Sequence, residues 1–344
     1  MSLRLPQNLF TSHRLIEEDE LIFRLNDQYR LTLLAGSDAP LPAALPNEEL
    51  SPLQATPALA RHLAGIYAHF VRLDDLRELL SALIQRIIRL AEQAPDGCVA
   101  AILLAPYSGY TAHHAINCAL LAARISGGLK LDPEERKTLT GAALTMNLGS
   151  AEVQNLLATQ NGPPSTLQRQ ILDIHPLLSS AILREAKIDS TQWHNTVLMH
   201  HERRDGRGYS FGVKNADIPP LAQLLHLLDV VCAKLMQRSY RSSVAPKVAL
   251  ASLYAGTMEA FDTQQVAQLV KILGIYPPGS FVELENGERA LVVKNGAIAS
   301  TPHVVPILST NQTIDTAEPG YHVRQGVSMR VDARHLPLFY QYWR

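Results

Sequence analysis

Residues 199–210 read MHHERRDGRGYS, and no other stretch of the 344-residue chain carries as much chemical information. The stretch ends an apolar helical run and places two adjacent histidines, His200 and His201, before a basic loop rich in glycine. Neighbouring side chains on a helix point about 100° apart, so the two rings can reach one point only near a helix end. Neutral imidazole is the usual protein ligand for first-row metals. The stretch therefore indicates either a metal site or a pair of solvated or capped histidines.

On either side of this stretch, apolar residues recur at spacings of three and four. This period predicts amphipathic helices from about 58 to 94 and again from 110 to 274. Asp74 and Asp75 suit the first turn of the second early helix, and the Pro-Asp-Gly at 95–97 is expected to end it. Breakers such as the Gly-Gly at 127–128 separate the later runs, and no run alternates with a strand. We therefore predict an all-helical domain over residues 56–274.

The two ends of the chain have a different pattern. Residues 1–55 combine short alternating stretches with a proline-rich tail, which predicts a small strand-containing segment followed by a linker. From 275 to 344 the apolar period falls to two, and SFVELENGERALVVKNG at 280–296 predicts a hairpin with Asn286 and Gly287 in a type I′ turn. HVVPILST at 303–310 predicts a further strand. The expected fold is mainly α, with a small β-rich C-terminal appendage.

Composition excludes several classes of protein. With 31 Lys and Arg against 32 Asp and Glu, the formal net charge is -1, so nothing draws the whole chain to DNA, RNA or an anionic membrane. Any anionic ligand must be held by a local group of positive charges. The three cysteines (Cys98, Cys118 and Cys232) are far apart and imply no disulfide framework.

The longest apolar run, at 98–106, is too short to span a bilayer, and the N-terminal residues do not have the pattern of a signal peptide. We expect a cytoplasmic protein.

Three more positions add to the histidine pair. His175 precedes a proline in ILDIHPLL, at what we interpret as the start of a helical run, and Asp229 lies inside the apolar run LLHLLDVVCAKL. A carboxylate in such a run is usually paired or bound to a cation if it faces inward. His113 and His114 begin the amphipathic stretch that follows GYTA. Taken singly, each of these residues is more often a satisfied core or surface residue than a ligand.

Taken in order, YTAHH, IHP, HHERRDGRGYS, LLDV and RSYR resemble the HD-GYP family over about residues 108–280. This family is the branch of the HD phosphohydrolase superfamily known for cyclic di-GMP phosphodiesterases. The resemblance implies an HD-type bundle of about five to seven core helices, within about 108–274, around a site for two or three metal ions. In the family these metals activate a water that attacks the phosphodiester.

The resemblance also implies roles for individual residues. The metal ligands, for Fe, Mn, Ni or Zn, would be His114, His175, His200, His201 and Asp229. The nucleotide-binding residues would be Arg238, Arg241, Arg207 and Tyr209. Arg203 and Arg204 could join these arginines in the local cationic group that the neutral chain requires.

The sequence departs from the family's pattern where its histidine-aspartate pair should stand. The aligned stretch is GAALTMNLGS, so Met146 replaces a histidine ligand, Asn147 the bridging aspartate and Ser150 a nearby lysine. Asparagine offers one neutral oxygen between two cations, and thioether sulfur is a poor ligand for hard or borderline dications. The first metal position would keep only His114 and Asp229. Cys232 also stands where the family usually has a second aspartate, three residues after the first.

These departures leave three functional hypotheses. In the first, the chain is a catalytically impaired member that binds cyclic di-GMP or a signalling partner, with or without metal. In the second, it is a phosphodiesterase with a reduced site, in which the three histidines His175, His200 and His201 hold a single ion. In the third, it is an interaction protein without nucleotide chemistry, and its low charge fraction and C-terminal appendage permit a homodimer interface.

Overall fold

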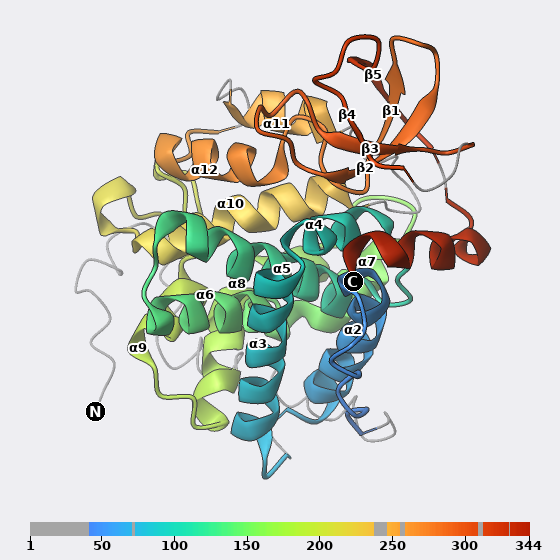
Figure 1. Ribbon diagram of the computed structural model, residues 1–344. Coiled ribbons are helices and arrows are strands. Elements are labelled where there is room, and N and C mark those ends of the chain that lie inside the picture. The colour runs from blue at the N-terminus through green and yellow to red at the C-terminus, as the bar shows by residue number, and fades with distance from the viewer. Residues whose placement is uncertain (1–40, 71–72, 237–245, 255–258, 309–311, 330) are drawn as a thin grey trace.

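The computed structural model describes residues 41–70, 73–236, 246–254, 259–308, 312–329 and 331–344 (Figure 1). Helices dominate these residues, which confirms the mainly α fold class. The α-helices are α2 (Pro52–His69), α3 (Leu76–Gln93), α4 (Pro95–Leu104), α5 (Tyr110–Leu129), α6 (Pro133–Thr145), α7 (Ala151–Thr159), α8 (Thr166–Glu185), α9 (Thr191–Leu198), α10 (Pro220–Leu235), α11 (Pro246–Tyr254) and α12 (Thr263–Leu273). Short 3-10 turns occur at η2 (Leu148–Ser150) and η3 (Asn215–Asp217). None of the described helices is both long enough and apolar enough to cross a lipid bilayer.

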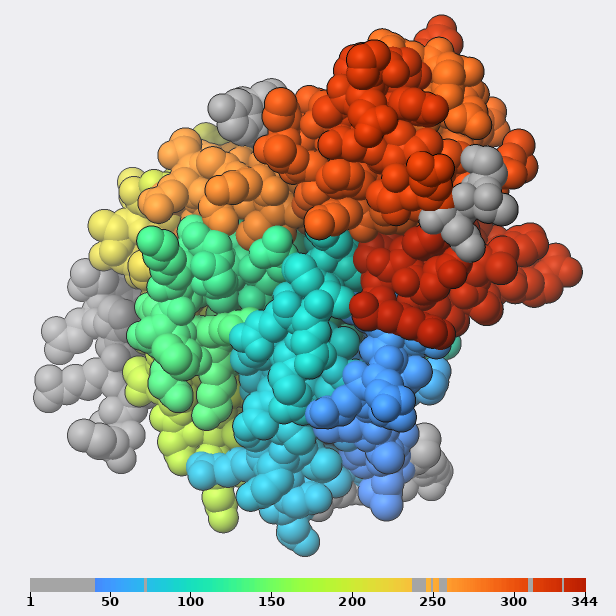
Figure 2. Space-filling model, in the orientation of Figure 1, coloured from blue at the N-terminus to red at the C-terminus, as the bar shows by residue number. Residues whose placement is uncertain are grey.

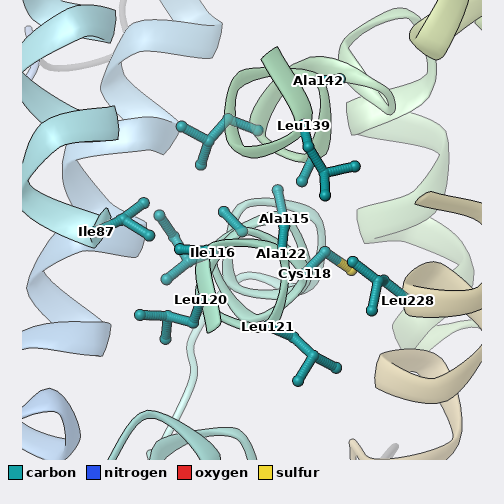
Figure 3. Packing of buried hydrophobic residues seen from close by; sticks show 14 of the residues in the cluster. Ile87, Ala115, Ile116, Cys118, Leu120, Leu121, Ala122, Leu139, Ala142 and Leu228 are labelled. Carbon is teal, nitrogen blue, oxygen red and sulfur yellow. The ribbon is translucent and has the colours of Figure 1, made fainter. Parts of the chain in front are cut away.

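Helix α5 is the centre of the helical core. Its sequence, YTAHHAINCALLAARISGGL, is rich in alanine, and small side chains let neighbouring helices approach closely on every side. Helices α2, α3, α6 and α10 all pack against it. In Figure 3, which looks along α5, Ile116 and Leu120 point toward Ile87 of α3, whereas Cys118 points toward Leu228 of α10. Residues at the start of α5 are therefore held inside the bundle.

The Pro-Asp-Gly at 95–97 was predicted only to end a helix, but it also begins the next one. Helix α3 does end at Gln93, but Pro95 is the first residue of α4, so the motif also begins a helix. Proline suits this first position because its missing N–H has no partner there in any helix, and its φ is already helical. Asp74 and Asp75 were predicted in the first turn of this helix, but α3 begins at Leu76, so Asp75 is the N-cap residue and the acidic residue of the first turn is Glu78.

A five-stranded antiparallel sheet follows the helices. Its strands are β1 (Phe281–Leu284), β2 (Arg289–Lys294), β3 (His303–Pro306), β4 (Ile314–Asp315) and β5 (Val323–Val327). They lie in the order β4-β3-β2-β1-β5. The predicted hairpin is present, with Phe281 opposite Leu291. Its turn type was predicted wrongly: only Gly287 has a positive φ (84°), and the Leu284 N–H donates to the Glu288 carbonyl across a three-residue loop. A type I turn followed by a left-handed glycine closes such loops.

Helix α4 joins the bundle to the sheet. Cys98, Val99 and Ile102 face the helical core, whereas Ala100 and Ala101 belong to a second apolar cluster with sheet residues. The 3-10 segment η4 (Ala333–Trp343) closes this second cluster and packs on α2 and α4. Figure 2 shows η4, in dark red, between the sheet and helix α2, in blue. The appendage therefore shares apolar surface with the bundle.

Two of the predictions about organisation lie partly outside what the structure describes. The predicted N-terminal strands fall in residues 1–40, which are outside the described residues. The described part of the 1–55 segment contains no strand, and α2 already begins at Pro52. The domain boundaries 1–55, 56–274 and 275–344 stay predictions.

Candidate metal and nucleotide site

The structure brings His175, His200 and His201 together. His175 comes from α8, and the adjacent pair follows the C-terminal end of α9, which is the helix-end placement that two neighbouring rings require. The Nε2 atoms of His175 and His200 lie 3.3 Å apart. One ring nitrogen from each of the three histidines lies within 4.8 Å of the others. A single ion could therefore contact all three rings.

A proline explains how the His175 ring is oriented. His175 lies in the middle of α8, not at the start of a helix as the sequence suggested, because α8 begins nine residues earlier with a capping box at Ser165. Pro176 has no N–H to donate to the carbonyl of Leu172, four residues back. The Nδ1–H of His175 donates to that carbonyl instead, at 2.6 Å. The ring is thereby fixed with its Nε2 lone pair directed at His200.

His200 is oriented in the same way by a helix end. Helix α9 ends at Leu198, so the carbonyl of Val197 has no helical N–H partner. The Nδ1–H of His200 donates to it at 2.7 Å. Hydrogen bonds of this kind to the second ring nitrogen are what orient metal-bound histidines in proteins.

This arrangement passes a physical test for a cation site. A carbonyl only accepts hydrogen bonds, so the Nδ1 atoms of His175 and His200 both carry the proton, and both Nε2 atoms present lone pairs. Two lone pairs 3.3 Å apart repel each other unless a cation lies between them. Burial lowers the pKa of His175 to about 3 and that of His200 to about 4, so both rings are neutral at pH 7. The donor set fits one borderline dication.

The basic loop folds back over the third histidine. The Tyr209 ring stacks on His201 with the ring centroids 4.6 Å apart. Glu202, which is 1% exposed, accepts the backbone N–H groups of Phe211, Gly212 and Val213 and so closes the loop. At Gly208, a Cβ atom would lie 2.4–2.5 Å from the backbone of residues 201–203, so the loop needs glycine there. Sequence reasoning missed Glu202, although its place directly after the histidine pair was a signal.

A second group of possible ligands lies between α5 and α10. His114 Nε2 is 2.7 Å from Asp229 Oδ1, and the Sγ atom of Cys118 is 3.6 Å from the same nitrogen. Burial raises the pKa of the Asp229 carboxyl, but the hydrogen bond from His114 and the nearby histidines outweigh it, and the net pKa lies well below its ordinary range. The resemblance placed His114 and Asp229 together at the first metal position. Sequence reasoning missed Cys118, which follows His114 by one helical turn.

The three residues that depart from the family's pattern, Met146, Asn147 and Ser150, pack in the core or form hydrogen bonds with neutral side chains. Met146 is fully buried in the apolar core at the end of α6. The Asn147 Oδ1 atom accepts a hydrogen bond from Gln154 Nε2 at 2.8 Å, and the same nitrogen lies 2.9 Å from Ser150 Oγ. The segment is also fastened to α8, since Ser179 Oγ donates to the Met146 carbonyl. A neutral side-chain network thus occupies the segment where the family's pattern has charged residues.

The predicted arginine group is only partly available to a ligand. Arg203 pairs with Glu259 at 2.9 Å, and Arg204 pairs with Asp262 at 2.9 Å. Arg207 is exposed on the basic loop. Arg238 and Arg241 lie outside the described residues.

Comparisons with known proteins agree with this architecture. A family model described as "HD domain" matches residues 77–264, which is more than half of the chain. A cyclic di-GMP phosphodiesterase of Pseudomonas aeruginosa is 27% identical over 68% of this chain and 56% of its own length. The response regulator RpfG of Xanthomonas campestris pv. campestris, also a cyclic di-GMP phosphodiesterase, is 28% identical over 46% of this chain and 44% of its own length. The 3′3′-cGAMP-specific phosphodiesterase 3 of Vibrio cholerae is 27% identical over 49% and 37%.

A solved structure shares the fold. It is Bd1817 from Bdellovibrio bacteriovorus, described as an HDG"Y"P protein, with a TM-score of 0.52 and 16% identity over 75% of this chain and 80% of that one. The chain spans about half the length of the curated relatives it matches. The motifs that resemble the HD-GYP branch lie within the matched residues, and the chain belongs to the HD domain family.

Proposed function

We propose that the chain is a cytoplasmic HD-GYP-like protein of cyclic di-GMP signalling that binds the nucleotide, or a signalling partner, without hydrolysing it efficiently. The observation that carries the proposal is that Met146 and Asn147 stand where the family's pattern has a histidine ligand and a bridging aspartate. Neither side chain supplies the charge that two adjacent dications need between them. Relatives named as cyclic di-GMP phosphodiesterases support the choice of nucleotide.

Each part of the site has a role in this proposal. His175, His200 and His201 would hold one Fe, Mn, Ni or Zn ion, and such an ion, when bound, lowers the pKa of a coordinated water toward ~7. Tyr209 stacks on His201 and offers a flat face beside the triad. We assign phosphate contact to Arg207, Arg238 and Arg241, because planar guanidinium groups bind phosphate oxygens in pairs. The net charge of -1 argues against DNA or RNA as the ligand.

The proposal is tested by measuring binding and turnover separately. We expect cyclic di-GMP to bind wild-type protein in calorimetry, with no product from cyclic di-GMP or from its linear dinucleotide. The double variant Met146→His with Asn147→Asp should gain metal and turnover, because it restores the missing ligand and bridging charge. Asn215→Asp is the matched control, since Asn215 is exposed outside the site. Turnover by the wild type as fast as by the double variant would contradict the proposal. If calorimetry detects no binding of cyclic di-GMP, only the partner-binding form of the proposal remains, for instance a homodimer.

A reduced phosphodiesterase is the second candidate, and the facing lone pairs of His175 and His200 favour it. On this reading a single ion at the three histidines supports slow hydrolysis. Elemental analysis of protein purified without chelator should then find metal, and His200→Ala should lose the ion held by the three histidines together with the turnover. His335→Ala, in an exposed histidine, is the control. Metal-free protein after reconstitution with Fe, Mn, Ni and Zn would eliminate this candidate.

A further inference from the structure

Two cysteines lie where α5 and α10 meet beside His114 and Asp229. Cys118 follows His114 by one helical turn on α5, and Cys232 follows Asp229 by three residues on α10. Residues three and four apart lie on the same face of a helix, so each helix presents two potential ligands to the other. Figure 3 shows the sulfur of Cys118 directed from α5 toward Leu228 of α10. The Cys118 thiol is within hydrogen-bonding reach of Cys232.

The atoms of this group are spaced for a metal with mixed ligands. In a tetrahedral zinc site with Zn–S near 2.3 Å and Zn–N near 2.0–2.1 Å, a sulfur and a nitrogen lie about 3.5 Å apart. Cys118 Sγ and His114 Nε2 are 3.6 Å apart. The third atom, Asp229 Oδ1, is 2.7 Å from His114 Nε2, as expected for a hydrogen bond, and would move outward by roughly half an ångström to join a common ion. One donor atom from each of the three residues lies within 4.8 Å of the others.

The alternative interpretation is that these cysteines are small apolar core residues, as buried cysteines often are. Cys98 fits that description, because it is buried in the apolar core and belongs to no group of potential ligands among the described residues. Cys118 differs, since its sulfur shares His114 Nε2 with a carboxylate that is 15% exposed. A carboxylate and a thiol that converge on one nitrogen make a polar pocket, which a purely apolar role does not require.

We propose that His114, Cys118 and Asp229 form a thiolate-containing Zn²⁺ site in place of the family's first metal position, with Cys232 supporting the Cys118 sulfur. Met146 and Asn147 replace the histidine and the aspartate of the family's pattern, so the usual nitrogen and oxygen donors are missing, and thiolate is the donor that favours zinc over Mn²⁺ and Fe²⁺. Binding releases the Cys118 thiol proton to solvent, and the proton that His114 Nε2 donates to Asp229 leaves that nitrogen, so that the ring binds the ion through Nε2 and keeps one proton on Nδ1. The thiolate and the carboxylate then balance the two charges of the ion, and His114 remains neutral. The proposal concerns metal selection and does not depend on nucleotide binding.

Cobalt is the probe, because Co²⁺ occupies zinc sites and absorbs light when a thiolate binds it. We expect chelator-treated protein titrated with Co²⁺ to develop a thiolate-to-cobalt charge-transfer band in the near ultraviolet, which Zn²⁺ then removes. The histidine triad contains no sulfur and cannot produce this band. The band should disappear in Cys118→Ser and persist in Cys98→Ser, the matched buried control. Cobalt binding without the band, or a band that survives in Cys118→Ser, would overturn the proposal.

X-ray absorption of the zinc-loaded protein covers the case in which Cys118→Ser does not fold. Wild-type protein, and the His200→Ala variant with its triad disabled, should both show a Zn–S distance near 2.3 Å. A shell of nitrogen and oxygen alone in both proteins would reject the site. Because neither measurement involves a nucleotide, its outcome is separate from the success or failure of the proposed signalling function.

Discussion

Pro176 shows how one residue can set the chemistry of its neighbour. By leaving the Leu172 carbonyl without a helical partner, it gives the Nδ1–H of His175 a fixed acceptor and directs Nε2 at the candidate ion. The sequence contained this information as the dipeptide His-Pro, yet it led us to expect a helix start. Geometry inside a helix was needed to interpret it.

We expect Pro176→Ala to strengthen helix α8 and weaken metal binding. The restored N–H would compete for the Leu172 carbonyl and free the His175 ring, and loss of such an outer contact typically costs roughly 10–100-fold in metal affinity. Zinc or cobalt titration measures the change. Pro57→Ala, in the interior of α2, is the control and should leave the affinity unchanged. Equal affinities in wild type and Pro176→Ala would show that the ring is held by other contacts.

His194, which belongs to neither group of candidate metal ligands, gives a pH dependence of stability. It is buried, bonded to Ser180 and to the Ile188 carbonyl, and burial lowers its pKa below the ordinary 6.5. Below pH 6.5 the unfolded chain binds a proton that the folded chain excludes, so the free energy of unfolding falls as pH falls, by at most ~1.4 kcal/mol per pH unit for one group. His194→Gln should reduce this slope in urea unfolding measured from pH 7 to 5. His335→Gln, an exposed control, should not, and identical slopes in all three proteins would contradict the assignment.

At the scale of elements, the sequence predicted which segments are helical but not how they meet. Periodicity located the helices, and the hairpin at 280–296 was correct except for its turn. Candidate ligands that follow a motif, such as His200 and His201, could be found in the sequence. Cys118 could not, because its proximity to the site depends on how α5 faces α10. The place of Glu202 after the histidine pair was a signal, but its role in closing the loop depends on the folded backbone.

The contact of α6 with α9 gives a test of this packing. A Cβ atom on Gly141 of α6 would lie 2.2 Å from the Trp193 ring of α9, whose Nε1–H also donates to Thr145. We expect Gly141→Ala to lower the free energy of unfolding by about 1–3 kcal/mol through overpacking. Gly127→Ala in α5, where a Cβ meets nothing within 4 Å, should instead be neutral or stabilise by up to ~1 kcal/mol. Chemical denaturation compares the two, and equal effects would refute the packing argument.

At the scale of the whole molecule, Trp343 connects the appendage to the bundle. Its side chain is 4% exposed, its Nε1–H donates to the Val293 carbonyl of β2, and it lies against Gly97 of α4. The sequence predicted the appendage but not this anchor, because nothing local marks which distant helix a tryptophan will contact.

We expect Trp343→Ala to cost about 3–5 kcal/mol of stability, as is typical for a buried tryptophan. Urea unfolding followed by circular dichroism measures the loss in the bundle as well as in the sheet. Leu338→Ala on the same segment is the control, since Leu338 is 61% exposed. A loss no larger than that of the control would mean that the appendage does not stabilise the bundle.

The two apolar faces of α4 also bear on how the chain emerges from the ribosome. Helix α4 ends at Leu104, whereas β1, which helps to cover one of its faces, begins at Phe281, roughly 180 residues later. At about 5–20 residues per second, that face waits about ten to thirty-five seconds for its partner strands to be synthesised. During this interval the nascent bundle presents an uncovered apolar strip of the kind that chaperones bind. Ribosome profiling of chaperone-bound nascent chains should therefore show engagement that begins after α4 has emerged and ends once the sheet is complete.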